Sequence, residues 1–313
     1  MKPDDYSFIR YLSAKKSVDD RSLNRHVWDT LKRLLDARDP RSPLTVLELG
    51  TGIGTMVERM LSWGLFAEAE ITALDVDPIL IAHAVQRIGE WASQQRYDVE
   101  RTNHQLELRK NGKVVQADFR VVDALDFVDQ QSDARQWDLL VANAFLDLID
   151  LQTALPRIFQ LCKPGGLFYF TINFDGATIF EPEWNANLDA WLHNLYHQTM
   201  DERLIKGRRS GDSRTGRHLY RWLKAAGAQP VDIGSSDWVV FPIDGAYPQD
   251  EAFFLHFIVD TFYQALAERD EVRLKGAALE DWTQTRRAQI NRAELLYFAH
   301  QLDYTGIYQP TPP

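Results

Sequence analysis

A short apolar segment that runs directly into a glycine-rich turn constrains the fold of this chain more than any other feature of its sequence. Residues 44–49 are Leu-Thr-Val-Leu-Glu-Leu, and residues 50–54 are Gly-Thr-Gly-Ile-Gly. Helical spacing follows at Met56, Val57 and Met60. Glycines permit a sharp turn and let a ligand approach the backbone, and free amide groups at a helix start suit a polar or anionic ligand group. The segment therefore predicts a strand, a ligand-binding turn and a helix.

The same alternation of strand and helix continues along the chain. Short apolar segments with strand character recur at residues 69–74, 119–122, 137–142 and 167–173. Helical spacing of apolar side chains lies between them, at residues 79–88 and 151–161. Such alternation indicates a mostly parallel sheet covered by helices on both faces.

Several stretches stand outside this alternation. Asn111-Gly112 separates two alternating segments and predicts a hairpin over residues 106–115, because both residues tolerate positive φ; we interpret it as a strand extension or insertion before the third core strand. The remaining expectations are helices at 21–37, 184–206, 219–226, 250–268 and 278–291, an exposed polar loop at 206–217, a sixth strand at 231–241 and a seventh at 295–301.

The composition is typical of a globular protein and disfavours several functional classes. The formal net charge of −10 over 313 residues disfavours a nucleic-acid binder, which must neutralise phosphates. Cys162 is the only cysteine, so we expect no intrachain disulfide and no metal site. No apolar run approaches the roughly 18 residues of a membrane helix, and the N-terminus is polar. We expect a cytoplasmic monomer or homodimer without membrane partners.

The spacing of the glycines distinguishes between nucleotide-like ligands. A dinucleotide fingerprint has the pattern G-x-G-x-x-G, whereas this turn has G-x-G-x-G and Thr55 stands where the last glycine would fall. Asp75 follows at the distance expected of an acid that accepts hydrogen bonds from ribose hydroxyls at the end of a second strand. A plain surface acid at the end of a strand is the alternative interpretation of Asp75.

With these features the sequence resembles the class I S-adenosylmethionine-dependent methyltransferases. The resemblance lies in five motifs that occur in order at residues 46–54, 73–78, 122–126, 137–143 and 163–167. It implies a doubly wound α/β fold with a seven-stranded, mostly parallel sheet whose last strand is antiparallel, together with N-terminal helices and a helical lid. The implied divisions are a helical cap at 1–40, a cofactor-binding core at 41–175, a lid at 176–230 and sheet-completing elements at 231–313.

The resemblance also implies which residues hold S-adenosylmethionine. The loop residues would shape the floor under its aminoacid part, Asp75 would hold the ribose with Val76 beside the adenine, and further residues would lie at the adenine edge and near the transferred methyl group. These residues are, in that order, Gly50, Thr51, Gly52, Gly54, Asp75, Val76, Asp123, Ala124, Asn143 and Ala144. Asp123 could instead be only a turn residue.

Other cofactor contacts are left open by the sequence. Glu48 is either an acid that orients the loop near the cofactor or a strand-end carboxylate with partners of its own. Tyr11 and Arg21, in a segment that also carries Lys15 and Lys16, could pair with the cofactor carboxylate. A solvated charged helix face is the alternative for that segment.

Methyl transfer from a sulfonium depends mainly on positioning, and a general base is needed only if the acceptor must lose a proton. Weak candidates for such a base are Asp147, Asp175, Glu181, His193 and His197, although the two histidines also fit a plain helix face. Aromatic residues that could line an apolar acceptor pocket are Phe8, Phe145, Trp184 and Tyr196. The arginine-rich stretch 208–217 favours a solvated loop bordering the cleft over a phosphate cradle.

These features favour a methyltransferase that acts on an O, N or C nucleophile of a small molecule. The alternatives are a nicotinamide-dependent oxidoreductase, which the glycine spacing disfavours, and a cofactor-binding scaffold without activity. The sequence does not predict the acceptor or its attacking atom.

Overall fold

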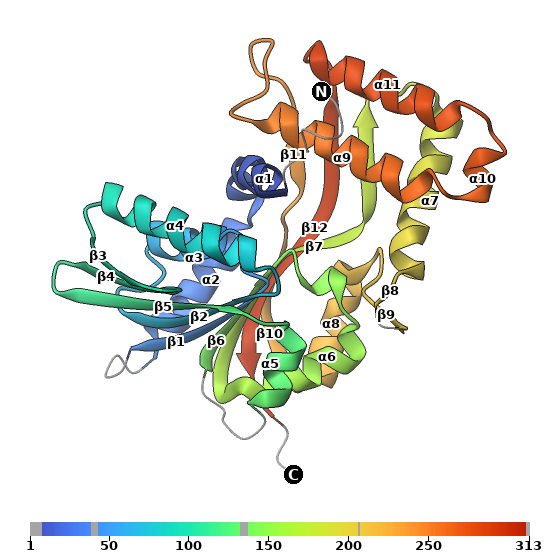
Figure 1. The fold of residues 1–313 in the computed structure, drawn as a ribbon. Coiled ribbons are helices and arrows are strands. Elements are labelled where there is room, and N and C mark those ends of the chain that lie inside the picture. The colour runs from blue at the N-terminus through green and yellow to red at the C-terminus, as the bar shows by residue number, and fades with distance from the viewer. Residues whose placement is uncertain (1–7, 39–42, 132–136, 206, 311–313) are drawn as a thin grey trace.

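The computed structural model describes residues 8–38, 43–131, 137–205 and 207–310, and it contains one large sheet of ten strands (Figure 1). Seven strands form its core, in the spatial order β10, β12, β7, β6, β1, β2, β5. Their bounds are Ala228–Ser235, Leu296–Tyr308, Cys162–Glu181, Trp137–Asn143, Leu44–Leu49, Ala69–Asp75 and Lys113–Val121. Only β12 runs antiparallel to its core neighbours, β7 and β10. The doubly wound, mostly parallel fold with an antiparallel last strand is confirmed.

Helices cover both faces of this sheet because its central strands are apolar on both sides. In β1, Val46 packs into one core cluster and Leu47 and Leu49 into the other, as alternate residues of a strand do. The first cluster includes side chains of α2 (Arg25–Asp36), α3 (Thr55–Ser62) and α4 (Pro78–Gln94). The second includes α5 (Ala124–Gln130), α6 (Leu151–Ile158), the 3-10 helix η3 (Phe159–Leu161) and α8 (Thr215–Ala225).

The predicted hairpin is present, but its second arm is the third core strand itself. Strands β3 (Asp98–Thr102) and β4 (Gln105–Lys110) extend the sheet beyond β5, and all of these pairings are antiparallel. Asn111 and Gly112 form the turn with φ of 55° and 76°. The expectation of a separate third strand beginning at Phe119 is wrong, because the alternating segment from Lys113 continues without a break to Val121.

The N-terminal segment forms two helices, and the helix predicted at 21–37 corresponds to the second of them. The first, α1 (Phe8–Ser22), ends before Leu23, and α2 begins after Asn24. The side chain of Asn24 accepts a hydrogen bond from the amide of Val27, which is the usual cap of a helix start. The chain therefore turns between the two helices, and α1 lies apart from α2, beside the C-terminal helices (Figure 1).

The C-terminal half adds a helical layer and several short strands. The layer contains α7 (Ala186–Glu202), α9 (Glu251–Leu266), α10 (Asp270–Arg273) and α11 (Ala278–Asn291). The stretch 206–217, expected as a loop, instead contains β9 (Arg208–Arg209) and the start of α8. Strand β9 pairs with β8 (Leu204–Ile205), which lies just before this stretch. The expected sixth strand is divided into β10 and β11 (Trp238–Val240), both paired with β12.

A buried carboxylate joins two helices of this layer. Asp189 on α7 is 3% exposed and accepts hydrogen bonds from Trp282 Nε1 and Arg286 Nη2 of α11, each at 2.7 Å. The same carboxylate accepts the backbone amides of Trp184 and Asn185. These donors, with Arg286 first among the charges, hold the pKa of Asp189 below its usual range despite burial, which opposes ionisation.

Removing this carboxylate should destabilise the protein strongly. Asp189→Ala leaves the guanidinium of Arg286 buried without a counter-charge, a situation that typically costs about 3–5 kcal/mol. Chemical denaturation monitored by circular dichroism would measure the loss. Asp281→Ala, an exposed acid in the first turn of α11, is the matched control and should cost less than about 1 kcal/mol. Equal losses in the two variants would contradict the role assigned to Asp189.

Candidate active site

The glycine loop after β1 is held in a conformation that only glycine adopts readily. Gly50, Gly52 and Gly54 have φ of 69°, 55° and 76°. A Cβ atom at Gly50 would lie 2.6 Å from Cδ2 of Phe145, and one at Gly52 would lie 3.4 Å from Cδ1 of Leu12. The loop is therefore covered closely by the segment after β6 and by α1.

Asp75 ties this loop to the end of β2. Its Oδ2 accepts the amide of Gly52 at 2.8 Å, and its Oδ1 accepts the amide of Asp77 at 3.0 Å. An ionised carboxylate offers about four lone-pair sites, so two remain for ribose hydroxyls. Asp75 is partly exposed, which leaves it accessible to a ligand.

Exposed apolar side chains lie directly after Asp75. Val76 is 68% exposed and Ile79 is 65% exposed, although most apolar residues of this region are buried. Across the loop from β2, Asp123 caps α5: its Oδ1 accepts the amides of Leu125 and Asp126. Asp123 is therefore a turn residue that caps a helix. The contacts of Asp123 and Ala124 with adenine stay predictions.

Glu48 is buried beneath the loop. Its carboxylate is 1% exposed and accepts the hydroxyl of Thr51 at 2.9 Å, so it orients the loop from below. Burial raises the pKa of Glu48 to about 7, opposed by the Thr51 hydrogen bond and by the charge of Arg59. Glu48 therefore has a partner within the loop, and its role near the cofactor stays a prediction.

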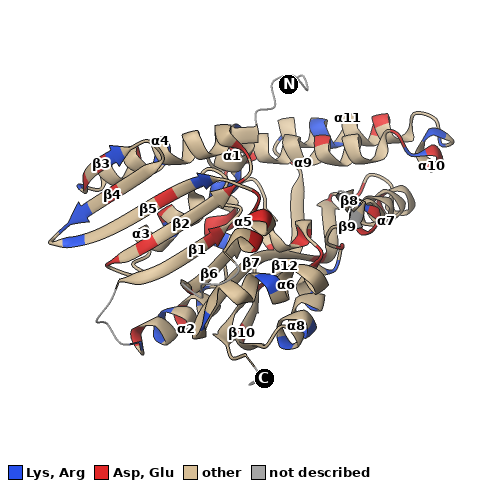
Figure 2. Cartoon of the chain, turned by 60° about the horizontal axis from the view of Figure 1, so that its bottom comes forward, with Lys and Arg blue, Asp and Glu red and all other residues tan. Residues whose placement is uncertain are grey.

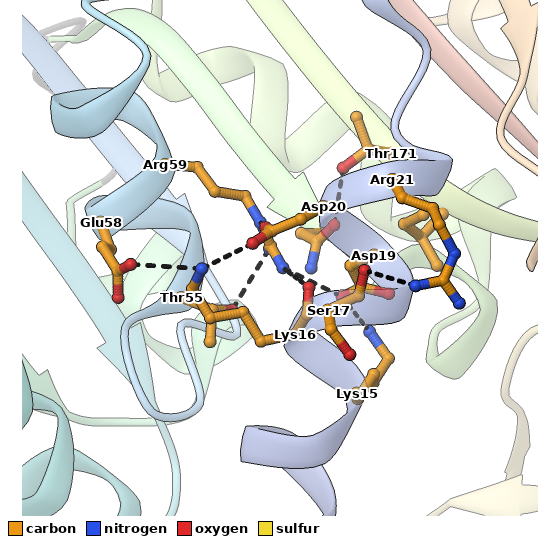
Figure 3. A network of polar contacts seen from close by, with 12 residues as sticks. Lys15, Lys16, Ser17, Asp19, Asp20, Arg21, Thr55, Glu58, Arg59 and Thr171 are labelled. Atoms are coloured by element: carbon orange, nitrogen blue, oxygen red, sulfur yellow. Dashed lines mark hydrogen bonds and ion pairs between the residues drawn. The ribbon is translucent and has the colours of Figure 1, made fainter. Parts of the chain in front are cut away.

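A buried ionic network fastens α1 over the loop (Figure 3). Arg59 of α3 is 1% exposed; its Nε donates to Asp20 at 2.6 Å, and its Nη2 lies 3.5 Å from Asp19. Lys15 and Lys16 pair with the same two aspartates, each at 2.6 Å. Lys15, Lys16, Asp19 and Asp20 of α1 therefore form ion pairs within the protein and do not make up a solvated charged face.

Arg21 and Tyr11, the proposed partners of the cofactor carboxylate, both have other contacts. Arg21 forms a bidentate pair with Glu251 of α9, at 2.6 and 2.8 Å. The ring of Tyr11 stacks on Phe257 of α9, with centroids 4.0 Å apart. Their assignment to the cofactor stays a prediction, and for Arg21 it requires that the guanidinium be shared with Glu251.

Asn143 is the last residue of β6, and it lies beside a residue of β7 with positive φ. Its Oδ1 accepts the hydroxyl of Thr171 at 2.8 Å, and the amide of Ala144 donates to the Thr171 carbonyl at 2.9 Å. The next residue, Ile172, has φ of 56°, which is rare for a β-branched side chain. The amide of Ile172 donates to the buried Asp303 at 2.8 Å, which holds this bulge in place.

Asp147 lies two residues beyond Phe145, in the 3-10 helix η2 (Leu146–Leu148), and it carries a buried oxygen without a partner. Among the described residues its Oδ1 has no hydrogen bond. Burial raises the pKa of Asp147, opposed by the positive charges of Arg203 and Lys15. Tyr11 and Tyr196 lie within electrostatic range of it, and their hydroxyls form no hydrogen bonds within the described part of the chain.

The other base candidates have different surroundings. Asp175 pairs with Arg217 at 2.7 Å and lies 3.5 Å from His300, and Glu181 accepts the amide of Glu183. His193 packs between Phe180 and Phe262, and burial lowers its pKa to about 4, so it is neutral at pH 7. His197 contacts the Thr178 hydroxyl at 3.2 Å, and burial lowers its pKa as well. Asp147 is linked to the glycine loop through Phe145, which packs on Gly50.

Sequence reasoning missed the residues that position α1. Asp19, Asp20, Arg59 and Glu251 were not identified as part of the site, because the pairs that join α1 to α3 and α9 link residues 39 to 234 positions apart along the chain. The one available signal was the density of charges at 15–21 on a helix with few apolar residues. In the described ranges no group of three His, Cys, Asp or Glu side chains could hold a metal ion, and no helix is long and apolar enough to span a membrane.

Glu48 should make the stability of the protein depend on pH. Its pKa is about 7 in the folded protein and 4.5 as a model group. Between these values the unfolded chain releases a proton that the folded protein keeps, so the contribution of Glu48 to stability falls as the pH rises. Glu48→Gln lacks this effect, and its stability relative to wild type should rise by up to roughly 3 kcal/mol between pH 4.5 and 7.5.

Denaturation at several pH values would measure this difference. The exposed Glu70→Gln, at the start of β2, is the control, and its curve should run parallel to wild type. A constant difference between Glu48→Gln and wild type would contradict the buried, protonated Glu48.

Comparison with known proteins identifies the family of this chain. A family model described as a methyltransferase domain matches residues 20–233. Phosphoethanolamine N-methyltransferase 2 of Haemonchus contortus, solved with phosphomonomethylethanolamine and S-adenosylhomocysteine, is 12% identical with a TM-score of 0.43; the match covers 97% of this chain and 59% of that one. This chain therefore spans less than two thirds of that enzyme.

A second similar structure is geranyl diphosphate C-methyltransferase of Streptomyces coelicolor, with 11% identity, a TM-score of 0.41, and coverage of 90% of this chain and 77% of that one. No curated protein matches the sequence. The family model nevertheless covers most of the chain, from the end of α1 to β10. The chain belongs to the methyltransferase domain family, which confirms the family that the sequence resembles.

Proposed function

We propose that this methyltransferase binds S-adenosylmethionine across the ends of β1 and β2 and methylates a small molecule that occupies the space beside Asp147. The observation that carries the proposal is the buried Oδ1 of Asp147, which has no hydrogen bond among the described residues. Native proteins rarely leave a buried carboxylate oxygen without a partner. An acceptor that donates a hydrogen bond to Asp147 would supply that partner.

The cofactor placement is supported by the loop and by Asp75. The positive φ angles at Gly50 and Gly52 turn the chain so that a ligand could approach its backbone. Asp75 retains acceptor capacity for ribose hydroxyls beyond its two amide partners. The exposed side chains of Val76 and Ile79 offer apolar area to a flat base. When bound, S-adenosylmethionine supplies a methyl group on a positively charged sulfur.

The polar groups near Asp147 define what the acceptor must offer. Burial raises the pKa of Tyr196 to about 12 and that of Tyr11 further, so both phenols keep their protons at pH 7 and can donate hydrogen bonds. Asp147, when ionised, accepts. An acceptor with a lone pair and an N–H or O–H bond fits this combination: the hydroxyls orient it, and Asp147 holds or takes its proton as the new bond to carbon forms.

The covering of the site favours a small acceptor. Helix α1 is fixed over the loop by buried ion pairs, and Leu12 of this helix contacts the position beside Gly52. The net charge of −10 opposes a nucleic-acid acceptor. These two features support a small molecule with an O, N or C nucleophile over a macromolecular acceptor.

Asp147→Asn should impair methyl transfer while leaving the cofactor site intact. The amide has the same shape but cannot take a proton, so transfer from labelled S-adenosylmethionine into a small-molecule metabolite extract should fall by about 10²–10⁴-fold. Calorimetry with S-adenosylhomocysteine should give the wild-type affinity. The exposed Asp98→Asn on β3 is the control. Full turnover by Asp147→Asn would contradict the role of Asp147.

Asp75→Ala should weaken the binding of S-adenosylhomocysteine by about 1–3 kcal/mol, because ribose hydroxyls would lose a charged acceptor. Asp75→Asn keeps one oxygen for the amide of Gly52, so its affinity for S-adenosylhomocysteine should lie between those of wild type and Asp75→Ala. Calorimetry measures both, with Glu70→Ala at the other end of β2 as the control. An affinity unchanged in Asp75→Ala would rule out the ribose assignment.

A further inference from the structure

A cavity of about 490 Å³ lies next to the chain segment that carries Asp147. Four separate stretches line it: residues 149–152 at the start of α6, Asp201 near the end of α7, the segment 209–214, and the first two turns of α8. Gly211 packs so closely on the backbone of Asp147 that a Cβ atom there would lie 1.9 Å from the Asp147 carbonyl oxygen. The cavity and the Asp147 segment therefore share a wall.

Three arginines line this cavity: Arg209, Arg214 and Arg221. Within the described ranges none of them has a carboxylate at ion-pair distance. Most other described arginines do pair with an acid, as Arg217 does with Asp175 and Arg157 with Asp129. Figure 2 shows the basic residues carried by α8, the helix that provides Arg221. Three arginines thus line one cavity without an acidic partner among the residues that the structure describes.

The acids that line the cavity are already occupied. Asp150 accepts the amide of Gln152 and the hydroxyl of Thr153, which caps α6. Asp201 accepts the amide and the hydroxyl of Ser213. These hydrogen bonds fix both carboxylates on neutral donors, so neither turns toward an arginine.

The third acid, Asp212, is occupied in the same way. Its Oδ1 accepts the amide of Arg214 at 2.6 Å, and its Oδ2 contacts Nδ1 of His218 at 2.9 Å. Asp212 thereby orients the imidazole at the cavity wall. The guanidinium of Arg221 is oriented too, because it stacks on the ring of Trp222 at 4.5 Å from the centroid.

We propose that this cavity binds an oxyanion, a phosphate or carboxylate group, through Arg209, Arg214 and Arg221. Guanidinium groups match such anions because their N–H donors lie in one plane and can bind two oxygens together. The three acids and three arginines of the lining balance in formal charge, so directional hydrogen bonds rather than net charge select the ligand. The anion is either a free ion or the charged end of the methyl acceptor, and the second case rests on the proposed function.

The test measures binding of inorganic phosphate to the full chain by calorimetry at constant ionic strength, with S-adenosylhomocysteine present. Wild type should bind phosphate saturably, and Arg209→Gln combined with Arg221→Gln should weaken binding about tenfold or more. The control combines Arg33→Gln and Arg101→Gln, two exposed arginines on α2 and β3, and makes the same change in net charge. Wild-type affinity in the control supports the site.

Absence of saturable phosphate binding, or equal weakening in both double variants, would overturn the proposal. Calorimetry with S-adenosylhomocysteine on the same proteins reports on the proposed function separately, since Arg209 and Arg221 are outside the cofactor site. A second arm distinguishes the sources of the anion: if it belongs to the acceptor, added phosphate inhibits labelled methyl transfer into a metabolite extract, and the double variant loses that inhibition. If phosphate binds but does not change the rate of methyl transfer, the ligand is a free anion.

Discussion

The buried guanidinium of Arg59 is the interaction on which the arrangement of this site depends. It comes from α3, the helix that follows the glycine loop, and it reaches Asp19 and Asp20 on α1. Removing ions from water is costly, so such a pair is no simple source of stability. Its geometry is nevertheless specific, because an uncompensated charge at 1% exposure would be strongly unfavourable in any other packing. The position of α1 over the loop is therefore determined by charge pairing rather than by apolar area alone.

The sheet places this covered loop at the point where the spatial order of the parallel strands reverses. From β1 the strand order proceeds through β2 to β5 on one side and through β6 to β7 on the other. Loops at such a switch point separate to opposite faces and leave a crevice at the carboxyl ends of the strands. Gly50, Asp75 and Asn143 come from three different strands and meet there for that reason.

The sequence predicted the local parts of this arrangement well. The bounds of β1 and α11, and the turn at Asn111-Gly112, follow from short-range patterns and are found in the structure. The helix predicted at 21–37 begins too early because the apolar spacing starts at Leu23, and only the cap by Asn24 marks the start of α2. The pairings of Arg21 with Glu251 and of Asp189 with Arg286 could not be predicted, since no local pattern connects residues so far apart along the chain.

Three acids of the site show how surroundings give the same chemical group different roles. Asp75 is partly exposed and accepts two backbone amides, and its remaining acceptor sites suit it to accept from hydroxyls. Glu48 is buried with one hydroxyl partner, and burial raises its pKa to about 7, which suits it to support the loop from below. Asp147 is partly exposed, but its Oδ1 is buried and lacks a partner among the described residues. Burial without compensation is costly unless a ligand relieves it, so the acid that stabilises the free protein least is the one best placed to hold an acceptor.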